Sequence, residues 1–273
     1  MCPRFTGVNA MRTRFVKSPD EIKHFQAVYA SPSFYDIHSL SIGFETDPDV
    51  VAEVLPPPLS VHDARATVSV SEIRRSDCVG PFFGAALNLS CSYEGEPGIY
   101  CLTMPMSTDT AVIFGRELFA EPKKIAEITL DERHQHLVGT VTRNGITYIE
   151  LTGSFDDGLR DAGRETVSHH YYFKYLPAAD GCGLAHDPQL VRVTHRGRIH
   201  RMTQGDGTIT FRESMHDPVI DIPVRSVLGA TYSELETHTT AEVVCTVDAE
   251  RFLPYAYGKI DDLLVWADDP VLA

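Results

Sequence analysis

The sequence lacks any long hydrophobic run. No window of about eighteen residues is both apolar and uncharged, so we expect no transmembrane helix. The first seven residues, Met1 to Gly7, also lack the apolar centre that a secretory signal needs. Both observations predict a soluble, cytoplasmic protein that does not enter a membrane.

Sequence motifs typical of metal-binding sites and of redox-active cysteine pairs are absent as well. The six cysteines include no Cys-x-x-Cys pair, which favours free thiols in a reducing compartment. The pair His134-x-His136 has no carboxylate or cysteine nearby to complete a ligand set, and His169 and His170 would point to opposite faces of a strand, so we expect no metal. There is no glycine-rich phosphate loop and no Gly-x-Ser-x-Gly motif, and no cofactor is expected.

Positive charge is scarce. The chain has 24 lysines and arginines against 38 acidic residues, a net charge of −14. This balance argues against nucleic acid and anionic membranes as partners. A small anionic substrate stays compatible with it, because a local pocket can oppose the overall charge.

The length of 273 residues and the 43% hydrophobic content allow a sizeable core. We find no linker or internal repeat, and therefore predict one domain over residues 1–273. Residues 1–30 would form an N-terminal arm with a helix opening at Ser18-Pro19, and residues 259–273 a C-terminal tail carrying Trp266.

Short strands with turns between them dominate the rest. The clearest hairpin signal is Asn144-Gly145 between residues 136–143 and 146–155, because Asn-Gly accepts the positive φ of a type I′ turn. Turns are also predicted at Gly95–Gly98 and Gly205–Gly207, and residues 64–155 are interpreted as strands throughout. Short helices are expected after Asp47, ending before Pro56, and after Asp248. Such a pattern is typical of a β-barrel or sandwich.

A lysine pair lies near the middle of the chain, in the segment Phe114 to Ile125. Lys123 and Lys124 follow Pro122 and have apolar residues close on both sides. Taken alone, such a pair is typical of an exposed turn, because lysines are rarely buried. Burial would instead penalise the ammonium form, and a neutral amine can attack a ketone to form an imine.

The stretch Gly115-Arg116-Glu117-Leu118 followed by Pro122-Lys123-Lys124-Ile125 resembles the acetoacetate decarboxylase family. Three further segments resemble the family more weakly and occur in the family's order: residues 55–59 before this stretch, and residues 171–177 and 216–224 after it. The resemblance covers roughly residues 35–257. It implies a mainly β (α+β) fold: a closed, cone-like antiparallel β-barrel with a few short helices. It also implies a homo-oligomer and imine chemistry on Lys123; acetoacetate decarboxylase is itself a known example of lysine activation.

The sequence departs from the family where the family's other charged groups are expected. Ile37 stands where typical members have an arginine, and Ser69 and Gly84 stand where they have glutamates. Glu72 could replace a glutamate only by a register slip, and an odd slip would turn it to the other face of the sheet. A branch of the superfamily keeps the lysine without these residues and uses the imine for aldol condensation and dehydration.

The resemblance therefore implies a lyase that acts on a small keto acid through an imine on Lys123. Aldol condensation and dehydration of a pyruvate-type substrate with an aldehyde co-substrate is favoured. The alternatives are decarboxylation of a β-keto acid such as acetoacetate and a non-catalytic barrel that binds a carbonyl ligand.

The catalytic candidates are Lys123 and Lys124. On an extended segment the two side chains would point to opposite faces, so we favour burial over the neighbouring charge of Lys124 as the way to activate Lys123. Four further residues are candidates for binding substrate: Phe82, Arg116, Glu117 and Tyr255. Arg116 and Glu117 are placed on a strand and turn, where they could instead form an ion pair, and Tyr255 or Tyr257 could supply a phenol as proton donor or simply pack.

Overall fold

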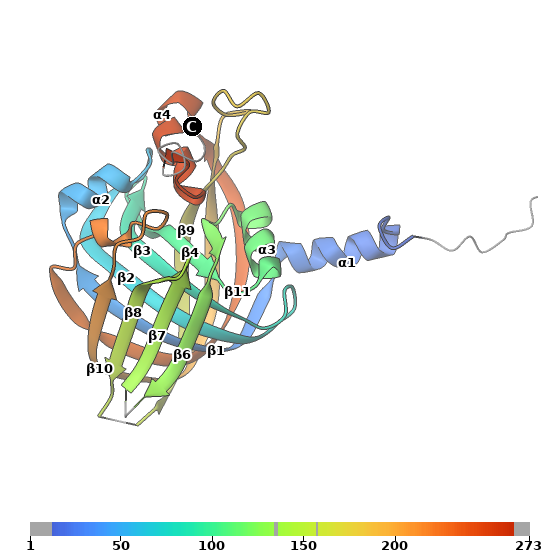
Figure 1. The fold of residues 1–273 in the computed structure, drawn as a ribbon. Coiled ribbons are helices and arrows are strands. Elements are labelled where there is room, and N and C mark those ends of the chain that lie inside the picture. Colours follow the sequence, from blue (N-terminus) through green and yellow to red (C-terminus); the bar gives the residue numbers. More distant parts are fainter. Residues whose placement is uncertain (1–12, 134–135, 157, 265–273) are drawn as a thin grey trace, which may run out of the picture.

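A computed structural model describes residues 13–133, 136–156 and 158–264 of the chain (Figure 1). In these ranges the fold is mainly β, with four α-helices. The helices are α1 (Pro19–Ala30), α2 (Pro48–Val54), α3 (Asp109–Phe119) and α4 (Ala249–Ala256), and two short 3-10 helices are η1 (Val219–Asp221) and η2 (Tyr257–Lys259). The strands are β1 (Ser33–Glu45), β2 (Ser60–Ser76), β3 (Phe82–Tyr93), β4 (Glu96–Met106), β5 (Lys123–Ile125), β6 (Glu127–Arg133), β7 (His136–Arg143), β8 (Ile146–Ser154), β9 (Arg160–Lys174), β10 (Gln189–Phe211) and β11 (Ser226–Thr246).

The sheet curves back on itself. Its strand order is β11-β1-β2-β3-β4-β9-β10-β8-β7-β6, and β10 also pairs with β11. The expected mainly β fold is thus confirmed, and the sheet is ring-like. Most neighbours are antiparallel, but β4 runs parallel to both β5 and β9, which the expectation of an antiparallel barrel did not include.

Two of the apolar clusters decide where the site lies. One packs β1, β2 and β3 against β7 and β8, and its centre includes Leu40, Leu87 and Leu151, all fully buried. The other draws residues from β1–β4, β9, β10 and α3, so it lies inside the ring; its buried members are Ile37, Ile73, Phe82, Cys101, Met104, Met106, Ala111, Phe119, Ala120, Tyr172, Val191 and Val193. We call this second group the inner cluster.

Several predicted elements are present. Asn144 and Gly145 have φ values of 51° and 77° between β7 and β8, which confirms the hairpin. Ser18 caps α1 in a capping box, and Asp47 and Asp248 cap α2 and α4 as predicted. The five described cysteines are free thiols, whereas Cys2 lies outside the described residues.

One glycine-rich turn was predicted wrongly, and another lies slightly earlier in the chain than predicted. Gly205 and Gly207 lie within β10, where Gly205 pairs with Ala230 of β11 and Gly207 with Gly153 of β8. An added Cβ on Gly207 would come within 2.9 Å of Ile42, so glycine is there for close strand packing and not for a turn. The turn between β3 and β4 is Glu94-Gly95, with φ values of 51° and 84°, and β4 already begins at Glu96.

The interpretation of residues 64–155 as strands alone was also wrong, because α3 interrupts them. Thr108 caps this helix by accepting a hydrogen bond from the backbone of Ala111. Its buried residues Ala111, Gly115 and Phe119 recur at intervals of four, the spacing of one helix face. The helix ends at Ala120, which adopts the left-handed conformation with φ 65°.

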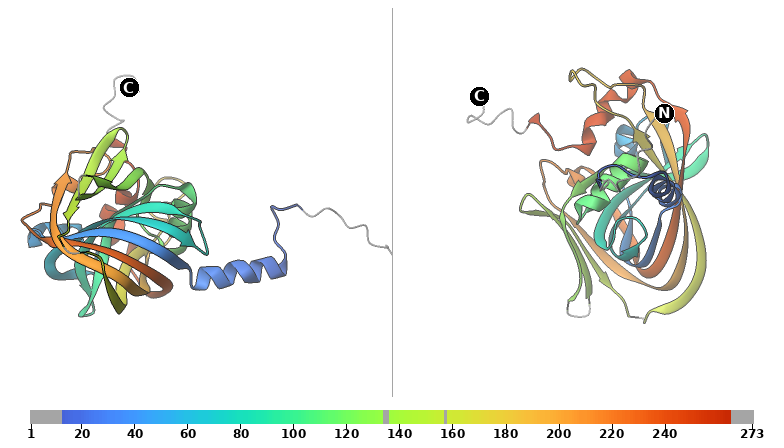
Figure 2. Two further views of the ribbon diagram at one scale, coloured as in Figure 1. Left: turned by 90° about the horizontal axis from the view of Figure 1, so that it is seen from below. Right: turned by 90° about the vertical axis from the view of Figure 1, so that its right-hand side faces the viewer.

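The helix α1 extends away from the body of the protein (Figures 1 and 2), and none of its residues is buried. Its end contacts α3 through an edge-to-face pair of Tyr29 and Phe114, with centroids 5.3 Å apart. Nowhere in the described part of the chain is a helix long and apolar enough to cross a lipid bilayer. Trp266 of the predicted tail lies outside the described residues.

Candidate active site

The turn between α3 and β5 carries the lysine pair. After the left-handed Ala120, Glu121 and Pro122 lead into β5, which runs parallel to β4 with Lys123 beside Met104 and Lys124 beside Pro105. Neighbouring residues of a strand point to opposite faces. Lys123 therefore shares the face of Met104, a member of the inner cluster, and Lys124 points the other way.

Both lysines are buried. Lys123 is 6% exposed and Lys124 is 9% exposed, so the interpretation as an exposed surface pair is wrong. The expected extended segment with opposed side chains is observed. Burying two ammonium groups is unfavourable unless each finds a partner.

The partner of Lys123 is Glu121, two residues before it. The Lys123 Nζ lies 2.7 Å from the Glu121 Oε2, and both side chains are less than a tenth exposed. Gly115 on α3 packs directly over the pair, and a Cβ at this position would collide with both side chains. A carboxylate this close can accept a proton from the lysine.

Three buried polar atoms at this site have no hydrogen-bond partner among the described residues: the Glu121 Oε2, the Tyr172 hydroxyl and the His170 Nδ1. Of these, the Glu121 Oε2 is ion-paired with Lys123. Burial raises the pKa of Tyr172 well above its usual value, with smaller contributions from Cys101 and Glu121. The phenol therefore keeps its proton and is a potential donor. Unsatisfied buried polar groups are uncommon, and together they mark a place where a ligand's polar atom would fit.

Two buried histidines lie near the pair. His195 contacts Thr239 through Nδ1 at 3.0 Å, and its ring lies edge-to-face against His170 at 4.7 Å. Burial lowers the pKa of His195, which Glu121 raises and Lys123 lowers to smaller extents. Burial also lowers the pKa of His170 well below its usual value. Both imidazoles are consequently neutral near pH 7.

The three positions that depart from the family pattern add no charge to the site. Ile37 belongs to the inner cluster, and an added Cβ on Gly84 would contact Met106. Ser69 is half-buried on β2 beside Ser41 of β1. Glu72 pairs with Arg74 at 2.9 Å on the other face of β2, so it does not replace a missing glutamate.

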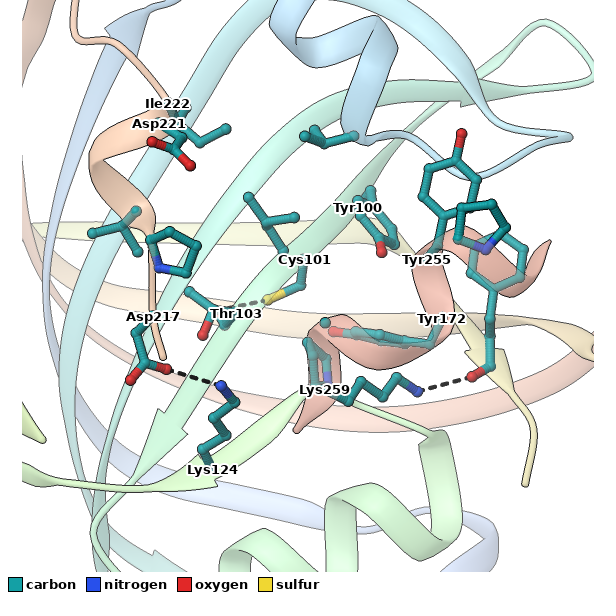
Figure 3. A pocket seen from close by; sticks show the side chains of 18 of the residues that line it. Tyr100, Cys101, Thr103, Lys124, Tyr172, Asp217, Asp221, Ile222, Tyr255 and Lys259 are labelled. Atoms are coloured by element: carbon teal, nitrogen blue, oxygen red, sulfur yellow. Dashed lines mark hydrogen bonds and ion pairs between the residues drawn. The ribbon is translucent and has the colours of Figure 1, made fainter. Parts of the chain in front are cut away.

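Lys124 belongs to a separate charge network (Figure 3). Its Nζ donates to the His216 carbonyl at 2.7 Å and to Asp217 at 3.2 Å, and lies 3.4 Å from Asp261. Arg143 contacts the same two carboxylates at 2.8 Å each. Its guanidinium lowers the pKa of Asp261. Two cations and two carboxylates thus balance each other around Lys124.

Two cavities adjoin the turn. The first has a volume of about 540 Å³ and is lined by Lys124, Cys101, Tyr172, Tyr255 and Lys259, among others. The second, of about 510 Å³, is lined by Arg116, Glu117, Glu121, Lys174 and Lys259, among others. Ala120 and Lys259 line both cavities.

The predicted substrate-binding residues are distributed over these spaces. Arg116 and Glu117 line the second cavity from α3, which corrects their placement on a strand and turn. Arg116 does not shape the turn through Glu117; it donates to the carbonyl oxygens of Lys123 and Lys259 at 3.0 and 2.9 Å. Tyr255 lines the first cavity, Phe82 packs inside the ring against Phe34 at 6.2 Å, and Tyr257 is half exposed in η2.

The sequence reasoning did not identify Glu121, Tyr172, His195 or Lys259. Glu121 directly precedes Pro122, so its closeness in sequence to the lysine pair could have identified it as a site residue. Tyr172 and His195 reach the site through pairing of strands that are distant in the sequence, and Lys259 reaches it from η2. Among the described residues, no group of three or more histidine, cysteine, aspartate or glutamate side chains could hold a metal ion.

Comparison with known proteins identifies the family. The family model for acetoacetate decarboxylase (ADC) matches residues 20–246. This is most of the chain, which therefore belongs to the acetoacetate decarboxylase family.

Relatives with assigned names include the acetoacetate decarboxylases of Burkholderia cenocepacia strain HI2424 and Burkholderia lata. They are 27% and 26% identical over 203 residues, covering 73% of this chain and 82% of each relative.

Solved structures share the fold. An acetoacetate decarboxylase from Legionella pneumophila superposes with a TM-score of 0.72 at 18% identity, covering 79% of this chain and 87% of that one. The enduracididine biosynthesis enzyme MppR, solved with the condensation product of pyruvate and imidazole 4-carboxaldehyde, superposes with a TM-score of 0.66 at 16% identity, covering 78% and 88%.

The charge network around Lys124 leads to a stability prediction. Asp217→Asn is expected to lower the free energy of unfolding by about 3–5 kcal/mol, because it leaves buried cations without their carboxylate. Urea denaturation followed by circular dichroism measures this. The matched control is Asp20→Asn, whose side chain is 97% exposed. An equal effect of both substitutions would contradict a structural role for the network.

Lys259 leads to a prediction on pH. Burial, with a smaller contribution from Arg116, lowers the pKa of Lys259 from 10.5 to about 7. Between pH 7 and pH 10.5 the Lys259 side chain binds more protons in the unfolded chain than in the folded one. Its contribution to the free energy of unfolding therefore rises with pH. Relative to Lys259→Met, the wild type should gain unfolding free energy from pH 7 to pH 9, by at most about 1.4 kcal/mol per pH unit. A pH-independent difference in urea denaturation would contradict the lowered pKa.

Proposed function

We propose that this protein is a lyase that forms an imine between Lys123 and a small keto acid. The observation that carries the proposal is the buried Lys123–Glu121 pair, 2.7 Å apart, facing the interior of the ring. An amine must be neutral to attack a carbonyl, and a lysine paired with a carboxylate inside a protein has a proton acceptor in place. Membership of a family named for acetoacetate decarboxylase supports the same chemistry.

Glu121 moves the protons in this mechanism. It takes one proton from the Lys123 ammonium, and the amine adds to the ketone carbon. A proton passes from nitrogen to the former carbonyl oxygen, giving a hydroxyl group. Glu121 then returns its proton to this hydroxyl, which leaves as water, and an iminium ion remains on Lys123.

Tyr172 has the right character to assist. Its buried hydroxyl has no hydrogen-bond partner among the described residues, and its raised pKa keeps it protonated. A ketone oxygen is an acceptor that this hydroxyl could satisfy. Tyr172 takes the role of phenol donor that the sequence suggested for Tyr255 or Tyr257.

The iminium ion can serve two reactions. We favour aldol condensation and dehydration, in which the enamine of a pyruvate-type substrate attacks an aldehyde and an acid then protonates the departing hydroxyl. The uncharged residues Ile37, Ser69 and Gly84 support this preference, because typical decarboxylases carry charged groups at these positions. Glu121 is suitably placed to be that acid.

The alternative is decarboxylation of a β-keto acid such as acetoacetate. The names of the Burkholderia relatives support it. There the iminium ion takes up the electron pair left by CO₂, and Glu121 or Tyr172 would protonate the resulting enamine. A third possibility, a barrel that binds carbonyl ligands without turnover, would leave the paired Glu121 without a chemical role.

Borohydride trapping tests the imine. With pyruvate or acetoacetate present, reduction should add one substrate-derived group to Lys123, detected by mass spectrometry of the digested protein. Lys123→Ala should abolish the adduct, and Glu121→Gln should slow trapping by about 100-fold or more, the usual effect of losing a general acid–base group. Lys23→Ala, at a mostly exposed lysine, is the matched control.

The proposal fails if neither keto acid adds mass, or if Lys123→Ala gains the adduct unchanged. Release of CO₂ from acetoacetate, measured against enone formation from pyruvate and an aldehyde, then separates the two reactions. CO₂ without enone would overturn the preference for aldol chemistry.

A homo-oligomer stays a prediction. The exposed apolar side chains of Ile22, Phe25 and Tyr29 on α1 support it, because such a projecting helix could pack against a second copy. Light scattering should give a mass that is a multiple of 30.3 kDa. A mass of one chain at micromolar concentration would contradict it.

A further inference from the structure

The sheet has a gap beside the strand that carries Lys123. On one edge of β4, residues Met104–Met106 pair with β5, while Ile99 and Tyr100 pair with β9. Cys101, Leu102 and Thr103 lie between these pairings and have no register partner in either strand. The carbonyl oxygens of Phe173 in β9 and of Ala120 before β5 therefore need other donors.

Lys259 supplies them. From η2 its Nζ donates to the Phe173 carbonyl at 2.8 Å and also to the Ala120 carbonyl. The same ammonium lies 4.7 Å from the centroid of the Tyr175 ring, a favourable cation–π contact. One side chain thus spans the gap between β9 and the turn that leads to Lys123.

Arg116 makes a second link between the same elements. Its Nη1 donates to the Lys123 carbonyl at 3.0 Å and to the Lys259 carbonyl at 2.9 Å. The Lys259 side chain therefore holds the beginning of the turn, and Arg116, which is bonded to the Lys259 backbone carbonyl, holds its end. Glu121 lies between these two attachment points.

The contact also separates the two cavities. Ala120 and Lys259 line both of them, whereas Glu121 lines only the second and Lys124 only the first. The hydrogen bond from Lys259 to Ala120 is therefore part of the wall between the spaces on either side of the turn. Loss of this bond would weaken the wall at Ala120, next to Glu121 of the second cavity.

We propose that Lys259 is a positioning residue for Lys123 and Glu121: it fixes the turn from Ala120 to Lys123 and keeps the two cavities apart. It does not touch the reacting atoms, and it acts through the backbone that carries them. The role in catalysis rests on the proposed function, but the role in fixing the turn does not.

Competitive acetylation tests the fixed turn without any keto acid. Trace acetic anhydride is added to the full-length protein, and modification of Lys123 relative to the exposed Lys23 is measured by mass spectrometry. In Lys259→Met, the relative labelling of Lys123 should rise by at least about five-fold, because the turn is released and the wall between the cavities is weakened. Lys259→Arg, which keeps a charged donor, should stay within about two-fold of wild type.

A second arm uses borohydride trapping at varied pyruvate concentration. Lys259→Met should lower the maximal trapping rate by about ten-fold or more while the half-saturating concentration changes less than two-fold, and Lys259→Arg should restore the rate. A variant that only weakened the fold would show native labelling and native trapping once it is folded. If Lys259→Met does not fold, Lys259→Leu, which also lacks a donor, replaces it in both arms.

Unchanged Lys123 labelling in a folded Lys259→Met or Lys259→Leu protein would overturn the proposal. So would equal labelling of the Met and Arg variants. If wild type shows no trapping at all while labelling responds to Lys259 as expected, the imine chemistry fails and the positioning role stands.

Discussion

The buried ion pair of Lys123 and Glu121 is the interaction on which the rest of the site depends. Two charges inside an apolar cluster are stable only if their partners are fixed, since a displaced partner would leave a buried charge uncompensated. The short turn from α3 to β5 provides this fixation. Gly115 lets the helix approach the pair, Ala120 turns the chain by its left-handed conformation, and the parallel pairing with β4 directs Lys123 inward.

Lys123 and Lys124 point to opposite faces of β5, and this gives them different roles, one in the proposed chemistry and one in structural support. Lys123 faces the inner cluster and lies near the neutral imidazole of His195 and the Tyr172 hydroxyl, which has no hydrogen-bond partner among the described residues. Lys124 faces Asp217 and Asp261, which are shared with Arg143, so its charge is balanced within a fixed network. Although the two lysines are adjacent in β5, Lys123 faces the proposed reaction site and Lys124 secures the strand.

The sequence was most informative where local chemistry determines structure. Asn144-Gly145 defines its own turn, and Ser18 and Asp47 define helix starts, so these elements were predicted correctly. Helix α3 was missed although Thr108 and the four-residue spacing of Ala111, Gly115 and Phe119 were visible, because the surrounding strand pattern was extended across it. Gly205 and Gly207 were misinterpreted because glycine serves close packing as well as turns, and only the tertiary fold distinguishes the two uses.

The site could be predicted only in part for a related reason. The family resemblance pointed to Lys123, which is buried and faces the inner cluster. That Ile37, Ser69 and Gly84 stand at the family's charged positions stays a prediction. Glu121 was not predicted, because it lies outside the family's usual acidic positions. Tyr172 and His195 come within reach of Lys123 through strand pairing, although they lie at least 49 residues away in the sequence, and Lys259 comes within reach from η2; no local pattern reveals either arrangement.

The most direct test of the central claim is a crystal structure of the protein reduced with borohydride in the presence of pyruvate or acetoacetate. The account predicts continuous electron density from the Lys123 Nζ to the former carbonyl carbon, with Glu121 still beside the nitrogen and Tyr172 within hydrogen-bond distance of the ligand. Density extending from Lys124 or Lys259 instead, or a ligand held without a covalent bond to Lys123, would contradict it.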